Sequence, residues 1–185
     1  MGRLAEAKGF GYLLESVKAL KEKYPGVRIS FGDTPSITNA NDFDGIDELR
    51  PGNFVFFDWM QRQLGSCCAD EIAMTVECPV VASYDQGERI VVHGGAVHLS
   101  KEAVKNEKGQ TIFGVVAGTE FGQMEPIGFV ESLSQEHGII KIPRQKHRKF
   151  APGDTISIWP VHSCLVADIA RFYKETHSGR IIEKM

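Results

Sequence analysis

The N-terminal part of the chain carries its hydrophobic residues at the spacing of one helical face. Between about Leu4 and Tyr24, one stripe collects most of the large apolar side chains, namely Phe10, Leu13, Leu14, Val17, Leu20 and Tyr24. Pro25-Gly26 ends this pattern, and Val27–Phe31 then reads as a strand. We interpret residues 1–45 as one αβ unit of a larger α/β domain, with no parallel neighbour for its strand visible in the sequence.

From residue 46 onward the pattern changes to short alternating segments separated by Gly, Pro and charged turns. Residues 50–58 are expected to form a turn and an aromatic strand, followed by a short helix over Trp59–Leu64. Further strands are expected at Ile72–Tyr84, Arg89–His93, Thr111–Val116, Gly128–Leu133, Gly138–Ile142, Thr155–Trp159 and Arg171–Thr176, with Arg180–Glu183 pairing back across His177-Ser178-Gly179. This pattern predicts a mainly β fold, with an antiparallel β-barrel-like domain over residues 46–185.

Composition narrows the classes of partner. The 185 residues are 42% hydrophobic with a formal net charge of -3, which does not suggest a nucleic-acid or anionic-membrane partner. No apolar run approaches membrane-spanning length, and the basic run at residues 144–149 reads as a solvated loop. The four cysteines, Cys67, Cys68, Cys78 and Cys164, form no CxxC pair, which favours a reducing, cytoplasmic compartment.

His162 and Cys164 are the first candidates for chemistry. They follow an alternating apolar run, so we expect them on one face of a strand end, about 6.6 Å apart between Cα atoms. An imidazole nitrogen and a thiolate there could bind one zinc ion and leave positions for water or substrate. The alternative is a buried histidine beside a buried free cysteine, and the spacing alone favours that alternative.

Three further clusters each allow two interpretations. Around Gly32, Asp33 and Thr34, either Thr34 caps a helix with Pro35 at its first position, or backbone N–H groups bind an anion. Glu136 and His137 form either an acid/base pair or, as we favour, part of a polar loop. The paired glycines of Gly94-Gly95 indicate a bulge or a close approach of two backbones.

These pieces, in their order, resemble a known family. The segments are Ser30-Phe-Gly-Asp-Thr-Pro-Ser36, Arg50-Pro-Gly-Asn53, Asp58, Gly94-Gly95, Ser134-Gln-Glu-His-Gly138 and Pro160-Val-His-Ser-Cys164. Together they resemble the C-terminal half of the D-threonine aldolase and D-serine dehydratase family, the metal-activated, alanine-racemase-like pyridoxal phosphate enzymes. The resemblance covers nearly the whole chain. It implies that residues 1–45 end a cofactor-binding α/β barrel and that residues 46–185 form the β domain that closes the site, commonly in a homodimer.

The resemblance also implies roles for individual residues. Ser30, Gly32, Asp33 and Thr34 match the turn that holds the cofactor phosphate. His162 and Cys164 match the ligands of zinc or another divalent metal, and the cysteine favours dehydratase-like chemistry. Glu136 and His137 belong near the catalytic site by their motif position. The implied substrate is a β-hydroxy-D-amino acid, carried by the cofactor while the metal holds its hydroxyl and carboxylate groups.

One departure from the family limits these expectations. Family members are much longer, and their Schiff-base lysine lies in the barrel half that we expect to be absent here. We therefore expect this chain to be inactive alone, with pyridoxal phosphate bound only in the context of the barrel, supplied by a complementing chain. The alternatives are a non-catalytic binding or assembly module, or a fragment of a split or decayed enzyme.

Overall fold

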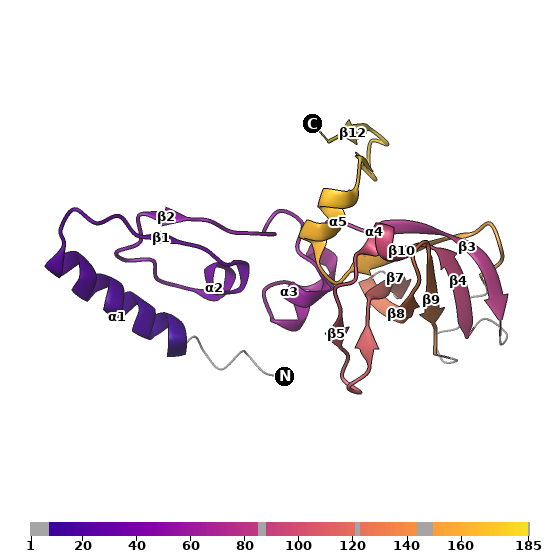
Figure 1. The fold of residues 1–185 in the computed structure, drawn as a ribbon, viewed down its shortest axis with the longest axis horizontal. Coiled ribbons are helices and arrows are strands. Elements are labelled where there is room, and N and C mark those ends of the chain that lie inside the picture. The colour runs from indigo at the N-terminus through magenta and orange to yellow at the C-terminus, as the bar shows by residue number, and fades with distance from the viewer. Residues whose placement is uncertain (1–7, 85–87, 121–122, 144–149, 185) are drawn as a thin grey trace.

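The centre of the fold is a closed antiparallel barrel. The structure is a computed structural model that describes residues 8–84, 88–120, 123–143 and 150–184. Six strands close the barrel in the order β10-β3-β4-β9-β8-β7 (Figure 1). Their bounds are β3 Val76–Tyr84, β4 Arg89–His93, β7 Gly114–Glu120, β8 Gln123–Leu133, β9 His137–Lys141 and β10 Thr155–Pro160. The expected mainly β, barrel-like fold is confirmed.

Alternation along these strands produces the core. Apolar side chains at every second position point into the barrel, where they are almost fully buried, as with Ile90 and Val92 on β4, Val130 on β8, Ile140 on β9, and Ile156 and Ile158 on β10. A closed barrel leaves no strand edge unpaired. The barrel therefore offers a rigid base on which the neighbouring helices are placed.

A second apolar cluster lies where helix α3 (Trp59–Gln63) meets the end of β10. Trp59 stacks on Trp159 with ring centroids 5.8 Å apart. Ile72, which follows the short helix η1 (Ala69–Glu71), packs here with Ile112 of β6 (Thr111–Ile112), while β5 (Val104–Lys105) pairs with β6. This cluster joins α3 to the barrel, and the helix expected at residues 59–64 is confirmed.

The N-terminal αβ unit extends away from the barrel in Figure 1. It contains α1 (Lys8–Lys23), β1 (Ser30–Phe31), α2 (Thr34–Asn39) and β2 (Glu48–Leu49). Leu14 and Val17 bury the inner face of α1, and Lys18 and Lys21 form ion pairs with Asp44 and Asp47 at 2.9 and 2.7 Å. The expectation that β1 lacks a parallel neighbour was wrong, because β2 pairs with it in parallel register.

Several element boundaries also differ from the prediction. The predicted helix start at residues 4–7 lies outside the described residues, as does the basic run 144–149. Residues 54–57 form a turn rather than an aromatic strand, since the N–H groups of Phe56 and Phe57 both donate to the Asn53 carbonyl. The strands expected from Val27 and Ile72 begin only at Ser30 and Val76.

The C-terminal part contains two short helices and a hairpin. Helix α4 (Ala96–Leu99) packs against α5 (Ser163–Ile169), and β11 (Phe172–Lys174) pairs with β12 (Ile181–Glu183) as expected. Among the described residues, no helix combines the length and apolarity that crossing a bilayer requires.

The paired glycines make the close backbone approach that the sequence indicated. A Cβ atom on Gly94 would lie 2.3 Å from the Cys78 sulfur, and one on Gly95 would lie 2.5 Å from the backbone of the turn at residues 135–137. The N–H groups of Ala96 and Val97 donate to the carbonyls of Ser134 and Gln135 at 2.9 and 3.1 Å. The start of α4 is thus fixed directly against the turn between β8 and β9.

We predict that Gly95→Ala destabilises the protein, because the added methyl group meets backbone atoms that cannot rotate away. Overpacking of this kind costs about 1–3 kcal/mol. Urea unfolding measures the loss. Gly11→Ala is the matched control: a Cβ at Gly11 meets nothing within 4 Å, and alanine is favoured over glycine within a helix. Equal stability of Gly95→Ala and the parent protein would contradict the close approach.

Candidate functional site

The predicted metal ligands lie where β10 gives way to α5. His162 is the N-cap residue of α5, and Cys164 lies in the first turn of the helix. The prediction that both sit on one strand face was wrong, because β10 ends at Pro160, and the strand spacing of about 6.6 Å therefore does not apply. Cys164 is exposed and His162 is half-buried, which also contradicts the alternative of a buried cysteine.

A buried carboxylate lies beneath this turn. Asp58 is 1% exposed and caps α3 by accepting a hydrogen bond from the Gln61 N–H at 2.8 Å. It also accepts one from the Ser163 N–H at 2.9 Å, and another from the side-chain amide of Asn53. One side chain therefore connects the loop at residue 53, helix α3 and the start of α5.

The surroundings of this carboxylate are unusually polar for an interior. Four buried side-chain atoms have no hydrogen-bond partner among the described residues: Gln61 Oε1, Ser66 Oγ, Trp159 Nε1 and Ser163 Oγ. All four belong to the segments 59–66 and 159–163, which the bond from Met60 N–H to the Val161 carbonyl (3.2 Å) joins. Buried polar groups normally have hydrogen-bond partners. The four unpartnered atoms thus distinguish this junction from the apolar interior of the barrel.

Glu136 lies in the turn between β8 and β9, as the loop interpretation expects, whereas His137 is the first residue of β9 and pairs with His93 of β4. The Ser134 hydroxyl bonds to both the N–H and the carbonyl of His137, at 3.2 and 3.1 Å. The structure adds two neighbours from other elements: the His93 ring lies 5.7 Å from the His137 ring and 4.9 Å from the His98 ring. The strand pattern could have placed His93 opposite His137, but His98 required the turn at Gly94-Gly95.

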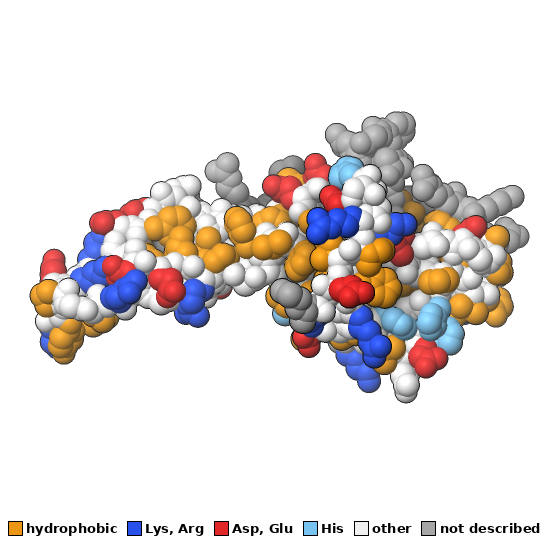
Figure 2. All heavy atoms as spheres, turned by 90° about the horizontal axis from the view of Figure 1, so that it is seen from above, with side chains coloured by type: hydrophobic (Ala, Val, Ile, Leu, Met, Phe, Trp, Pro, Cys, Tyr) orange, Lys and Arg blue, Asp and Glu red, His pale blue; other side chains and the backbone are white. Residues whose placement is uncertain are grey.

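This histidine cluster perturbs one of its members. Burial, and then repulsion from His93, hold the pKa of His98 below its ordinary value, while Glu136 acts in the opposite direction. His98 Nδ1 accepts a hydrogen bond from the Gly95 N–H at 3.3 Å, which is an interaction of the neutral ring. Figure 2 shows pale blue histidine side chains gathered on the barrel part of the molecule.

At the predicted phosphate-binding turn, the side chains of Asp33 and Thr34 already accept hydrogen bonds from nearby backbone N–H groups. Asp33, rather than Thr34, is the N-cap of α2 and accepts a hydrogen bond from the Ser36 N–H at 2.7 Å. The Thr34 hydroxyl accepts a bond from the Gly52 N–H at 3.1 Å. The turn therefore does cap a helix, but the prediction of Thr34 as the cap with Pro35 at the first helical position was wrong, because Thr34 is itself the first residue of α2.

Ser30 and Gly32 complete this turn. The Ser30 hydroxyl donates to the Glu48 carboxylate and accepts a bond from Arg50 Nε at 2.7 Å. A Cβ at Gly32 would lie 2.7 Å from the Arg50 carbonyl oxygen, so glycine allows β1 and the segment after β2 to approach closely. That Ser30, Gly32, Asp33 and Thr34 bind a cofactor phosphate stays a prediction.

The described residues contain no larger group of potential metal ligands than the His162–Cys164 pair. Within residues 8–84, 88–120, 123–143 and 150–184, no three His, Cys, Asp or Glu side chains lie close enough to hold a metal ion. Burial raises the pKa of Cys67 to about 11 and that of Cys78 to about 12, so both remain thiols near neutral pH. Cys164, by contrast, is exposed and can be reached by a metal ion from solvent.

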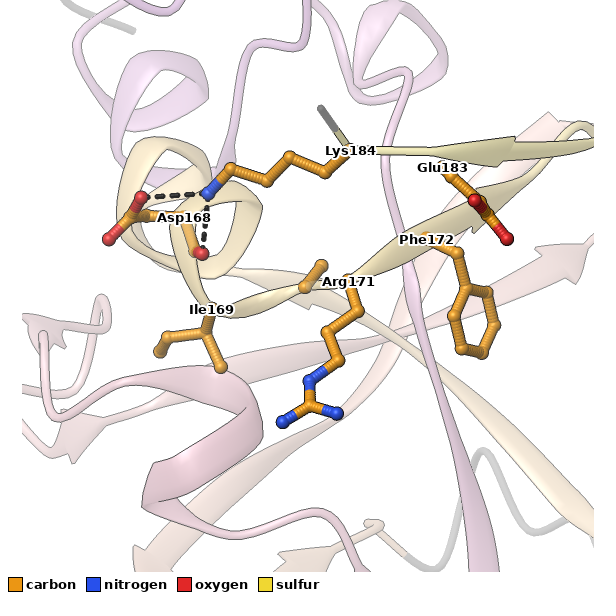
Figure 3. Close-up of a pocket in the computed structure, with 7 residues that line it drawn as sticks. Asp168, Ile169, Arg171, Phe172, Glu183 and Lys184 are labelled. Carbon is orange, nitrogen blue, oxygen red and sulfur yellow. Dashed lines mark hydrogen bonds and ion pairs between the residues drawn. The ribbon is translucent and has the colours of Figure 1, made fainter.

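A surface groove lies further along the chain, between the end of α5 and the β11–β12 hairpin (Figure 3). Lys184 crosses it to bond with the Asp168 carboxylate at 2.8 Å and the Asp168 carbonyl at 2.7 Å. Its lining consists of Asp168, Ile169, Ala170, Arg171, Phe172, Glu183 and Lys184. None of the predicted site residues contributes to it.

Comparison with known proteins identifies the family. Residues 73–174, more than half of the chain, match the family model described as "Putative serine dehydratase domain", and the chain belongs to this family. It is 29% identical over 168 residues to D-threo-3-hydroxyaspartate dehydratase from Delftia sp. (strain HT23), covering 87% of this chain and 44% of that protein. It is 30% identical over 176 residues to D-serine dehydratase from Dictyostelium discoideum, covering 89% of this chain and 42% of that protein. The chain thus spans less than half the length of these relatives.

Solved structures share the fold. An alanine-racemase-like protein from Idiomarina loihiensis matches 91% of this chain and 47% of its own, with a TM-score of 0.75 and 24% identity. A Cys→Ala variant of D-threo-3-hydroxyaspartate dehydratase in the metal-free form matches 91% and 50%, with a TM-score of 0.72 and 23% identity. A His→Ala variant of that enzyme gives 0.69 and 23%, covering 91% and 49%. D-threonine aldolase from Filomicrobium marinum gives 0.59 and 21%, covering 91% and 43%.

We predict that His98 titrates below the ordinary histidine pKa of about 6.5. Since the folded protein binds this proton less readily than the unfolded one, stability should fall as pH drops through 6.5, and the loss is complete below the folded pKa. NMR titration of the ring proton measures the midpoint directly. His93→Gln should raise it by removing a repelling charge.

His177→Gln is the control for this titration. His177 is exposed in the turn between β11 and β12, so its replacement should leave the His98 midpoint unchanged. A His98 midpoint at or above 6.5 in the parent protein would contradict the described environment.

Proposed function

We propose that this chain is the metal-bearing C-terminal part of a pyridoxal phosphate-dependent lyase that acts on β-hydroxy-D-amino acids. The observation that carries the proposal is the His162-x-Cys164 turn at the start of α5, in a chain of the serine dehydratase domain family. In the metal-free relative a cysteine is replaced, and in the other variant of the same enzyme a histidine two residues earlier is replaced. The same two residue types stand at the same spacing here.

The residues present fit a zinc ion. Zinc accepts both imidazole nitrogen and thiolate sulfur, and a catalytic site leaves part of its coordination shell to water or substrate. The exposed Cys164 and the half-buried His162 are both accessible from solvent. His162 would supply a ring nitrogen, and Cys164 would supply its sulfur as the thiolate.

The metal, when bound, would act as a Lewis acid on the substrate hydroxyl group, whose departure defines a dehydratase. His162 and Cys164 would hold that metal beside the barrel and would leave the rest of its coordination shell open to water or substrate. Glu136 and His137 remain candidates to move a proton. Helix α4 connects this pair to the His162–Cys164 turn. The Ala96 N–H at the start of α4 donates to the Ser134 carbonyl, and α4 packs against α5.

The turn at Ser30–Thr34 fits a phosphate group only in part. Asp33 already covers the helix start with a carboxylate, and Arg50 is the one cation described in contact with this turn. We therefore assign no step to pyridoxal phosphate in this chain alone, and propose that it binds where a barrel carrying the Schiff-base lysine completes the site.

The proposed partners follow from what the N-terminal unit leaves exposed. Tyr12 and Leu20 of α1 and Leu49 of β2 are large apolar side chains that are 69%, 41% and 40% exposed, and β1 and β2 form a sheet of only two strands. Such a sheet gains stability from further strands. We propose that a complementing barrel chain, or a second copy in a homodimer, covers it.

The free cysteines support a cytoplasmic setting.

We predict that the purified chain binds about one zinc per molecule and that His162→Ala or Cys164→Ala removes it, because each variant loses half of the protein ligands. Elemental analysis after dialysis measures this. His177→Ala and Cys68→Ala are matched controls, since they remove an exposed histidine and an exposed free cysteine elsewhere. Zinc retained in both ligand variants would contradict the proposal.

A further inference from the structure

Asp58 is the only carboxylate that is buried among the described residues, and it lies 105 positions from its most distant partner. Burial of a carboxylate is costly unless hydrogen bonds compensate for the lost water. Its bonds divide between two oxygens: Oδ1 accepts from the Gln61 N–H, while Oδ2 accepts from the Ser163 N–H and from Asn53. Capping α3 uses only the first oxygen, so the second serves another purpose.

The second oxygen holds the backbone on one side of His162, and α3 holds it on the other. The Ser163 N–H is fixed by Asp58 at 2.9 Å, and the Val161 carbonyl accepts a bond from the Met60 N–H at 3.2 Å. These anchors lie on the residues immediately before and after His162. Trp59 also stacks on Trp159, so α3 packs directly against the end of β10.

Ser163, the residue between the two predicted ligands, is 0% exposed and faces inward. Cys164, the next residue, is exposed, as a thiol must be to reach a metal that also meets substrate. The N–H of a first helical residue has no partner within its own helix. Without Asp58, nothing described would hold this N–H group in place.

We propose that Asp58 is a positioning residue, which fixes the backbone of the His162–Cys164 turn so that imidazole and thiolate meet one metal ion. This inference rests on the proposed metal-binding function. Asp58 itself contributes no ligand. Residues that orient metal ligands typically change affinity by roughly 10- to 100-fold when replaced.

Asp58→Asn tests this role selectively. An asparagine keeps one acceptor oxygen and remains a good N-cap for α3. Its amide group replaces Oδ2 with a donor, which cannot accept a bond from the Ser163 N–H. Asp154→Asn is the matched control, since Asp154 is exposed and accepts a comparable bond from the Ala151 N–H at 2.8 Å, at the opposite end of β10 from α5.

The measurement is a Co²⁺ titration of the whole chain, read from the thiolate-to-cobalt absorption band, together with amide hydrogen exchange over residues 161–166. We expect Asp58→Asn to weaken Co²⁺ binding about tenfold and to accelerate exchange at Ser163 by about as much. Asp154→Asn should change neither. Exchange measured on both folded variants separates a local loosening from global instability.

Two results would overturn the inference, and they differ. If the unaltered chain binds Co²⁺ with the thiolate band and Asp58→Asn binds it equally well, Asp58 does not position the ligands. If the unaltered chain shows no thiolate band up to millimolar Co²⁺, the proposed metal site fails, and the positioning role fails with it.

Discussion

The hydrogen bonds of the buried Asp58 carboxylate are the constraint on which the candidate site depends. They bring together residues 53, 61 and 163, which lie in a loop and two helices. A buried carboxylate tolerates few arrangements, because each lost partner exposes an uncompensated acceptor in a medium that solvates it poorly. The junction between the barrel and the His162–Cys164 turn is therefore defined by polar geometry, whereas the barrel itself is defined by apolar packing.

The barrel supplies the rigidity that this junction needs. Strand β10 pairs on both sides, with β3 and with β7, and its side chains Ile156, Ile158 and Trp159 are nearly fully buried. The chain therefore leaves β10 at a fixed point and in a fixed direction. Helix α4 provides a second connection between the barrel and α5. Its first residues donate hydrogen bonds to the turn after β8, and the helix packs against α5. The Glu136–His137 pair and the His162–Cys164 pair are thus both placed by the same barrel.

The sequence predicted those parts of the fold that local patterns determine. Alternation identified the barrel strands, and the bounds of Arg89–His93 were correct because turn residues flank a short apolar run. The same logic failed at α5. Alternation continues to Val161, but the next residues turn into a seven-residue helix whose first N–H group is bonded by Asp58, 105 positions away. It also failed at residues 54–57, where aromatic residues suggested a strand but the Asn53 carbonyl closes a turn. Long-range hydrogen bonds leave no periodic signal in the sequence.

The central claim is that His162 and Cys164 together form half of a metal site. X-ray absorption spectroscopy of the zinc-loaded chain tests this most directly, because it reports the atoms around the metal itself. The account predicts one sulfur at about 2.3 Å and nitrogen or oxygen neighbours at about 2.0–2.1 Å, with the sulfur absent in Cys164→Ala. A coordination shell of nitrogen and oxygen alone in the unaltered chain would contradict it.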